Sequence, residues 1–335
     1  MPVNRVLVTG ANGFIGAHVV RAALDIGAEV RAMVREGSDQ RSLAGLPVEI
    51  VHGDLTDPAS LANAVNGIDT LFNVAARYDL SRRARRDAYR ANVDGTRDLM
   101  LAALRAQIDR VVQTSSVAAI GPPRDPSRPA DESQWTDIDR APGPYEETKI
   151  LSERLVHELV QTESLPAVCV QPTAPIGQLD FKPTPTGRLI RDAANGAMPA
   201  YIRTAGLNVV HVQDVAEGHV NAATMGRVGE RYILGHGEGN MTLREIIEHA
   251  AVAGGASVPR MALPSTVAFA AALIDEFLIS ALTRQQPRAT IAGVRLARQR
   301  QFFDCGKAIE ELQLPQTDLD ETFNEAVTWF QKVGR

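Results

Sequence analysis

The stretch RVLVTGANGFIG, residues 5–16, decides the fold class of this 335-residue chain. The residues before its first glycine predict a buried strand, and helical spacing of apolar residues starts at Phe14. Gly10, Gly13 and Gly16 permit a tight turn, and the helix start offers free N–H groups to a phosphate. A glycine-rich turn that binds nothing is the alternative for the motif alone. At the start of an alternating α/β chain, however, the motif indicates a dinucleotide-binding loop.

Short β-rich runs alternate with helical patterns through the first half of the sequence. The predicted strands cover residues 5–9, 29–35, 48–54, 69–76, 110–116 and 167–172. The predicted helices cover residues 14–26, 57–65 and 92–106, with another that starts near residue 144. Strands that alternate with helices pair in parallel through right-handed crossovers. The pattern therefore predicts an α/β fold with a Rossmann-type, doubly wound parallel sheet.

The pattern changes after Pro172. Residues 173–206 are rich in proline and glycine, and residues 207–226 return to a strand followed by a helix. Thr242 and Glu245 have the spacing of a capping box that starts a later helix. We therefore expect a smaller, interleaved C-terminal substrate domain. The expected dinucleotide-binding domain comprises residues 1–172 and about 207–235, and the expected substrate-binding domain comprises about 173–206 and 236–335.

Composition excludes several classes of function. The net charge of −5 gives no basic footprint for nucleic acid. Cys169 and Cys305 lie in apolar or strand-like contexts, which predicts buried thiols and no disulfide framework. The seven histidines have no metal-ligand spacing, so we expect no metal site.

The sequence indicates a soluble cytoplasmic protein. Its first residues already form a predicted strand, so we expect no signal peptide. The most apolar segment, Val267–Leu282, is interrupted by Asp275 and Glu276. It is too short and too charged to span a bilayer, so we expect an amphipathic helix there.

The end of the second predicted strand bears on the choice of cofactor. An acidic residue there suits the ribose hydroxyls of NAD, whereas an arginine suits the 2′-phosphate of NADP. This strand ends at Arg35, with Arg31 earlier in it, so NADP is the preferred cofactor. Glu36 follows directly and leaves NAD open, and a solvated charge is the structural alternative for Arg35.

Two later strand ends also face the expected cofactor. Asp54 ends the third strand, where its carboxylate could accept a hydrogen bond from the adenine amino group or could stabilise a turn. Ala75 and Ala76 follow the fourth strand, where a bulky side chain would collide with a cofactor.

Tyr145 and Lys149 are one helical turn apart and can face the same cleft. A free tyrosine has a pKa of about 10, which is too high for a proton shuttle near neutral pH. A neighbouring ammonium group favours the phenolate and lowers that pKa. Tyr145 could then exchange a proton with an oxygen whose carbon exchanges hydride with a nicotinamide. Ser115 and Ser116 end the fifth strand, at the sheet edge where ligands bind, and could hold that oxygen.

Together these motifs resemble the extended short-chain dehydrogenases/reductases. The matching segments are TGANGFIG, GDLTD, NVAA, NVDGT, TSS, YEETK, VQPTAPIG and VHVQDVA, which cover about the first 220 residues. The tail FFDCGKAIEEL also resembles the closing strand and helix of that family. The resemblance implies an NAD(P)-dependent enzyme of the epimerase/dehydratase type.

The resemblance also implies a role for each matching residue. Ser116 positions the substrate, Tyr145 is the acid/base, Lys149 holds the nicotinamide ribose, and Asn92 supports the helix that carries them. The implied cofactor-binding residues are Gly10, Asn12, Gly13, Phe14, Ile15, Gly16, Arg35, Asp54, Leu55, Ala75, Ala76, Thr114, Tyr145, Lys149, Pro172 and Ile176.

Within the family, the segments that most resemble the hopanoid-associated sugar epimerase group are FKPTPTGRLI, NGAMPAY and LNVVHVQDVAEGH. That group is close to the dihydroflavonol 4-reductase-like proteins. The leading hypothesis is an NAD(P)-dependent reductase or dehydrogenase that acts on a carbonyl/alcohol pair of a small-molecule substrate. A nucleotide-sugar epimerase with retained cofactor and a dinucleotide sensor without activity are the alternatives. Tyr78 and Arg188 are candidate substrate contacts, and residues 77–90 form either a solvated charge run or an anion-binding lid. Members of the family often form homodimers through the helices at 92–106 and 145–159, although some reductase-like members are monomers.

Overall fold

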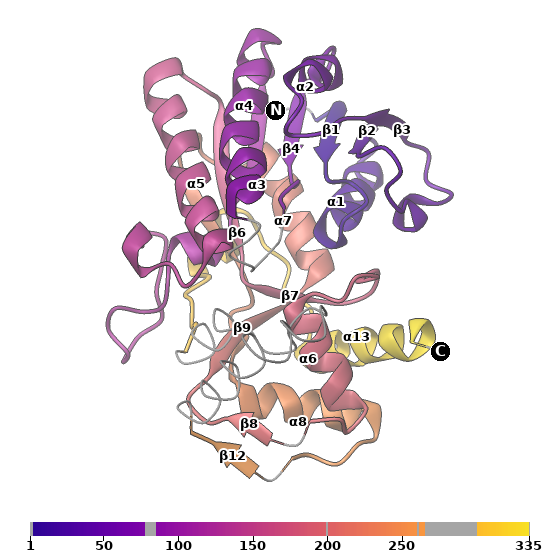
Figure 1. Ribbon diagram of the computed structural model, residues 1–335, viewed down its shortest axis with the longest axis vertical. Coiled ribbons are helices and arrows are strands. Elements are labelled where there is room, and N and C mark those ends of the chain that lie inside the picture. Colours follow the sequence, from indigo (N-terminus) through magenta and orange to yellow (C-terminus); the bar gives the residue numbers. More distant parts are fainter. Residues whose placement is uncertain (1–2, 78–84, 199, 260, 265–299, 335) are drawn as a thin grey trace.

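The computed structural model describes residues 3–77, 85–198, 200–259, 261–264 and 300–334 (Figure 1). Tyr78 and the helix expected over Val267–Leu282 lie outside the described residues.

A seven-stranded sheet forms the larger lobe of the molecule. Its strand order is β10-β6-β5-β4-β1-β2-β3, and every neighbouring pair is parallel. The strands are β1 (Arg5–Thr9), β2 (Glu29–Val34), β3 (Glu49–His52), β4 (Thr70–Asn73), β5 (Arg110–Thr114), β6 (Ala167–Pro172) and β10 (Arg231–Leu234). Order and direction confirm the predicted Rossmann-type, doubly wound sheet.

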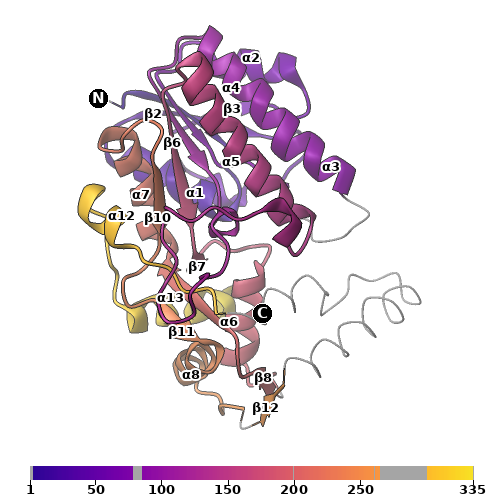
Figure 2. The same cartoon turned by 90° about the vertical axis from the view of Figure 1, so that its left-hand side faces the viewer.

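Helices cover both faces of this sheet. The helices α1 (Phe14–Asp25) and α7 (Val212–Thr224) pack on one face. The helices α2 (Pro58–Val65), α4 (Gly95–Arg105) and α5 (Pro144–Glu163) pack on the other (Figure 2).

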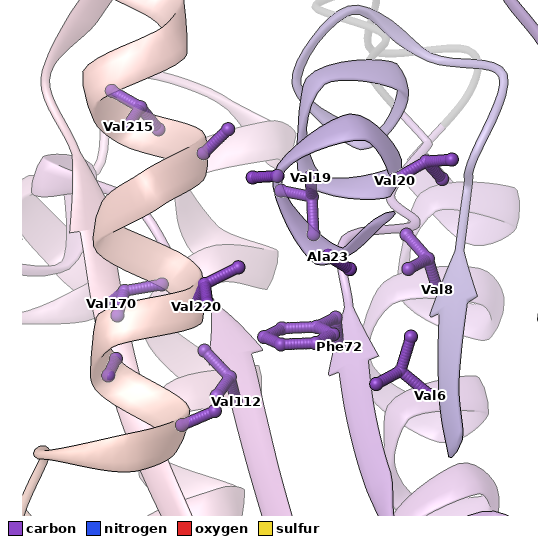
Figure 3. Packing of buried hydrophobic residues seen from close by; sticks show 14 of the residues in the cluster. Val6, Val8, Val19, Val20, Ala23, Phe72, Val112, Val170, Val215 and Val220 are labelled. Atoms are coloured by element: carbon purple, nitrogen blue, oxygen red, sulfur yellow. The ribbon is translucent and has the colours of Figure 1, made fainter. Parts of the chain in front are cut away.

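The interior strands are largely apolar on both faces because each face is covered, whereas β3 at the sheet edge is mostly exposed. Val6 and Val8 of β1 belong to the core beneath α1 and α7, whereas Leu7 belongs to the opposite core. Figure 3 shows the first of these cores, in which Phe72 and Val112 lie between the strands and the two helices. This double burial explains the continuous apolar runs that predicted the strands.

The smaller lobe is built around a second sheet. Its strands are β7 (Ala174–Ile176), β9 (Gly206–His211) and β11 (Asn240–Thr242), with β9 central. A parallel pair, β8 (Ala200–Ile202) and β12 (Met261–Leu263), lies beside it (Figure 1). The helices α6 (Pro185–Ala194), α8 (Leu243–Gly254) and α13 (Leu319–Val333) enclose the core of this lobe.

The capping box predicted at Thr242 is present and starts α8. The Thr242 hydroxyl accepts a hydrogen bond from the Glu245 N–H at 3.3 Å, and the Glu245 carboxylate accepts one from the Thr242 N–H at 2.6 Å. These two bonds satisfy donors that a helix start otherwise leaves unpaired.

The chain passes between the two lobes several times. The sequence grouped residues from about 207 with the dinucleotide-binding part, and the structure places 207–211 in β9 of the small sheet. The following α7 and β10 return to the large lobe. Near the C-terminus, α12 (Gly306–Glu311) packs against β10 before α13 joins the small lobe.

Candidate functional site

A cavity of about 3630 Å³ runs along the carboxyl ends of the large sheet and down to the small lobe. Segments that follow all six strands β1 to β6 line it, as do residues 179–186 and 203–208 of the small lobe. In an open parallel sheet, this is the edge at which ligands bind.

The glycine turn forms the upper wall of the cavity. Gly10 has a φ of +63°, and a Cβ there would lie 2.8 Å from the Cα of Ala75. A Cβ on Gly16 would collide with the Gly10 carbonyl oxygen. The turn is thus packed so closely against β4 and α1 that side chains are excluded from both positions. This cradle, at the start of α1, fits a pyrophosphate.

All six residues predicted for the turn, Gly10, Asn12, Gly13, Phe14, Ile15 and Gly16, line the cavity. Asn12 also ties the turn to the loop after β2. Its side-chain amide donates to the Asp39 carbonyl oxygen at 2.8 Å, and its own carbonyl oxygen accepts from the Ser42 hydroxyl at 3.1 Å.

The arginines of the second strand have different environments. Arg31 donates to the Glu49 carboxylate at 2.9 Å and to the carbonyl oxygens of Ala64 and Asn66. Arg35 is exposed and lines the cavity. Of the two arginines, Arg35, which directly follows β2, is therefore the one placed where it can meet a ligand.

Asp54 and its neighbour Leu55 line the cavity as well. The Asp54 carboxylate accepts hydrogen bonds from the N–H and the hydroxyl of Thr56, at 2.8 and 2.7 Å. Partial burial raises the pKa of Asp54, but the two Thr56 donors and nearby Arg35 outweigh it, so the pKa is lowered. The carboxylate thus stabilises the turn after β3 and also lines the cavity. Ala75 and Ala76, which follow β4, line the cavity too.

Tyr145, Lys149 and Ser116 line the same cavity below the glycine turn. Tyr145 and Lys149 lie in the first turns of α5, and the Lys149 ammonium nitrogen is 6.0 Å from the centre of the Tyr145 ring. Ser116 follows β5, and its hydroxyl accepts from the Ala118 N–H at 3.2 Å. The three side chains expected to perform the chemistry therefore meet in one cavity.

Lys149 is almost entirely buried. Its ammonium group donates to the carbonyl oxygen of Thr114 at 2.9 Å, and Thr114 also lines the cavity. Burial lowers the pKa of Lys149 to about 8, and the opposing charge of Glu153 limits that fall. At neutral pH the group is thus mainly a buried cation beside Tyr145.

Asn92 lies behind the cavity, outside its lining. It sits in a π-helical turn, η3 (Arg90–Asp94), and donates to the Thr148 hydroxyl of α5 at 3.0 Å. Its carboxamide also exchanges hydrogen bonds with the backbone of Arg77, at 2.7 and 3.0 Å. Asn92 therefore joins the segment after β4 to the helix that carries Tyr145.

The remaining predicted residues are divided between the cavity and the core. Pro172 and Arg188 line the cavity, and Arg188 donates to the Pro183 carbonyl oxygen at 2.9 Å. The Ile176 side chain is buried in the core of the small lobe, outside the cavity lining. Over the part of the chain that is described, no cluster of side chains has the composition of a metal site.

Comparison with known proteins identifies the family. The family model described as "NAD dependent epimerase/dehydratase family" matches residues 6–235. This chain belongs to that family.

The relatives of this epimerase/dehydratase family member include reductases. A Synechocystis protein provisionally named dihydroflavonol 4-reductase is 40% identical over 331 residues, which are 98% of this chain and 94% of that protein. Sterol demethylase protein B of Methylococcus capsulatus is 36% identical over 332 residues, with 98% of both chains covered. The crystal structure of gox2253 superposes with a TM-score of 0.86 and 38% identity over 100% of this chain and 99% of that one.

These similarities confirm the resemblance drawn from the motifs. The family member is an NAD(P)-dependent enzyme of the extended short-chain dehydrogenase/reductase type. No helix among those the structure describes is both long and apolar enough to cross a membrane.

The structure adds two buried residues to this family member's site that the motifs did not predict. The Nε2 of His219 on α7 lies 2.9 Å from the Thr114 hydroxyl, and burial lowers the pKa of His219 to about 4, so the imidazole is neutral. Glu153 lies one turn after Lys149 and bonds Ser115. The spacing of four residues from Tyr145 through Lys149 to Glu153 could have indicated the second of these, whereas His219 has no comparable signal.

Proposed function

We propose that this chain is a reductase that prefers NADP and interconverts a carbonyl and an alcohol on a small-molecule substrate. One observation supports this most strongly. Tyr145, Lys149 and Ser116 line the same cavity as a glycine turn shaped for a pyrophosphate. A bound nicotinamide would supply the hydride there.

The proton chemistry follows from the chain's own residues. The Ser116 hydroxyl orients the substrate oxygen by a hydrogen bond. Tyr145 donates its proton to that oxygen, and the resulting phenolate is stabilised by the adjacent Lys149 ammonium. Because Lys149 donates to the Thr114 carbonyl and is buried, its charge is poorly screened and acts strongly on the phenol.

Replacement of Tyr145 by phenylalanine tests this role. Tyr145→Phe removes only the hydroxyl, so we expect turnover to fall by about 10²–10⁴-fold. Binding of NADPH, followed by its fluorescence, should remain within a factor of a few. A suitable assay panel comprises dihydroflavonols, steroid ketones and nucleotide sugars, because relatives are named for such compounds.

Tyr89→Phe is the matched control. The Tyr89 hydroxyl bonds the Glu147 carboxylate at 2.8 Å, and Tyr89 is outside the cavity lining. This variant should keep its turnover. Full activity of Tyr145→Phe on any substrate that the wild type reduces would contradict the proposed proton transfer.

Arg35 is proposed to select NADP through the 2′-phosphate. A charge-assisted hydrogen bond contributes about 1.5–3 kcal/mol, so Arg35→Ala should weaken NADPH binding by about 10–100-fold. NADH binding should change little, because NADH lacks the phosphate. Titration calorimetry with both cofactors measures this, and Arg97→Ala on the exposed side of α4 serves as control. Tighter binding of NADH than NADPH by the wild type would overturn the preference.

We also propose that the large lobe binds the cofactor and the small lobe binds the substrate.

We further propose that the enzyme is located in the cytoplasm and acts on a small molecule and not on nucleic acid. A homodimer through α4 and α5 would follow the family, and analytical ultracentrifugation distinguishes it from a monomer.

A further inference from the structure

Glu153 is a fully buried acid directly behind the proposed catalytic residues. It follows Lys149 by one turn of α5 and shares its helix face. Its carboxylate accepts hydrogen bonds from the Ser115 hydroxyl, from Gln171 at 2.6 Å and from the Arg231 Nε at 2.6 Å. Ser115 directly precedes Ser116, so this carboxylate holds the strand end that presents the Ser116 hydroxyl.

Arg231 extends the same network to the cavity wall. Its Nη1 donates to the carbonyl oxygens of Glu132 and Gln134 at 2.6 and 2.9 Å. Its guanidinium carbon lies 3.8 Å from the centre of a Trp135 ring, and both Gln134 and Trp135 line the cavity. One ion pair therefore connects α5, β5, β6 and β10 with a segment of the cavity wall.

A buried ion pair is a poor source of stability, because desolvation offsets most of the attraction between its charges. The position of this pair suggests another role. We propose that Glu153 and Arg231 are positioning residues, which hold the Ser115–Ser116 strand end and set the charge of Lys149. This inference rests on the proposed function, since it assigns the pair to the same proton transfer.

The Lys149 ammonium group is surrounded by groups from three elements of the fold, α5, β5 and α7. On its own helix are Tyr145 and the carboxylate of Glu153. From β5 the Thr114 carbonyl oxygen accepts a hydrogen bond from the Lys149 ammonium group, and from α7 the neutral His219 lies against the Thr114 hydroxyl. Glu153 favours the ammonium form of Lys149, and the Arg231 guanidinium partly neutralises that carboxylate through their bond of 2.6 Å.

Opposite shifts of the pH profile test the pair. Because the ammonium form of Lys149 supports reduction, kcat/KM should fall as pH rises through the pKa of this lysine. Glu153→Gln removes the negative charge and leaves Arg231, so this alkaline limb should move about one unit to lower pH. Arg231→Gln leaves Glu153 and should move the limb to higher pH.

Two further variants separate charge from structure. Glu153→Asp keeps the charge, so its alkaline limb should stay near that of the wild type even if kcat falls. Ser115→Ala keeps both charges and loosens the strand end, so kcat should fall several-fold while the limb stays in place. If activity is lost while the alkaline limb stays in place, or if the limb moves in the same direction in both Gln variants, the pair has a purely structural role and the proposal is wrong.

Cofactor binding provides a readout that needs no substrate. The pH dependence of NADPH affinity should show the same opposite shifts, because Lys149 is proposed to contact the cofactor. If the wild type binds NADPH but reduces no carbonyl compound, the reductase proposal fails while these shifts still test the ion pair. If only the binding shifts are absent, the inference about Glu153 and Arg231 fails alone.

Discussion

Glu146 is a buried acid whose pKa is changed by its surroundings. It follows Tyr145 directly and is 5% exposed, and among the described residues its Oε2 has no hydrogen-bond partner. Burial raises the pKa of the Glu146 carboxyl to about 7, and the neighbouring charge of Glu147 adds to the rise. The folded protein therefore holds this carboxyl protonated at pH values where the unfolded chain has released the proton.

The consequence for stability has a definite sign. Between pH 4.5 and about 7 the folded state binds the extra proton, so the free energy of unfolding falls as pH rises through this window. Glu146→Gln cannot titrate and should escape this loss. Above pH 7 the variant should be more stable than the wild type by up to roughly 3 kcal/mol, and the difference should vanish near pH 4.5.

Urea unfolding at several pH values measures this difference. Glu147→Gln is the matched control, because Glu147 is less buried and already bonds Arg85 and Tyr89. Its free energy of unfolding should still fall between pH 4.5 and about 7, because Glu146 still titrates, although loss of the Glu147 charge makes that fall somewhat smaller. A constant difference between Glu146→Gln and the wild type across the range would contradict the proposed protonation.

Residues with a geometric requirement were the most predictable from sequence. Glycine at positions 10 and 16 and the four-residue spacing of Tyr145 and Lys149 each reflect a constraint that local sequence expresses. Asp54 illustrates the limit, because its bonds to Thr56 depend on how the turn closes. The buried charge of Arg231 was unpredictable, because its partner Glu153 is 78 residues away in sequence.

At the scale of elements, the helix predicted over 92–106 begins differently in the structure. An α-helical segment, α3 (Arg85–Tyr89), leads into the π turn η3 and then into α4. A Cβ on Gly95 would collide with the carbonyl oxygen of Leu55, so the helix start packs tightly against the loop after β3. The π turn also places Asn92 toward Thr148. A pattern with a period of 3.6 residues cannot reveal a wider turn, which is common near functional sites.

The strand β9 shows a second feature of an element that the sequence pattern alone could not predict, namely the sheet to which the strand belongs. Its apolar run predicted a strand, and the structure contains one over Gly206–His211. Its partners are β7, which precedes it by about thirty residues, and β11, which follows it. Periodicity detects that a segment is extended, but the choice of sheet depends on contacts between segments distant in sequence.

At the scale of the whole molecule, the two lobes form the walls of one cavity. β6 passes to β7 through Thr173 alone, and β9 leads directly into α7 (Figure 1). The large lobe contributes the glycine turn and Tyr145, and the small lobe contributes Arg188 and Arg203. A cofactor and a substrate that occupy this cavity would therefore contact each other where the lobes meet.

This arrangement is compatible with both a reductase and an epimerase, because both need hydride and proton exchange at one carbon. Their use of the cofactor differs. A reductase must exchange its oxidised cofactor in every cycle, whereas an epimerase returns the hydride to its substrate and retains it. The function proposed here, a reductase, requires cofactor exchange.

We therefore expect one NADPH to be consumed for each alcohol formed, over many turnovers per enzyme. Absorbance of the reduced nicotinamide and chromatographic quantification of product, recorded together, test this ratio. Tyr145→Phe provides the background of cofactor oxidation without catalysis. A nucleotide sugar converted to its epimer with no net change in absorbance would instead assign the chain to the epimerases. That outcome would leave the proton role of Tyr145 intact, because both reactions need a group that moves a proton at the substrate oxygen.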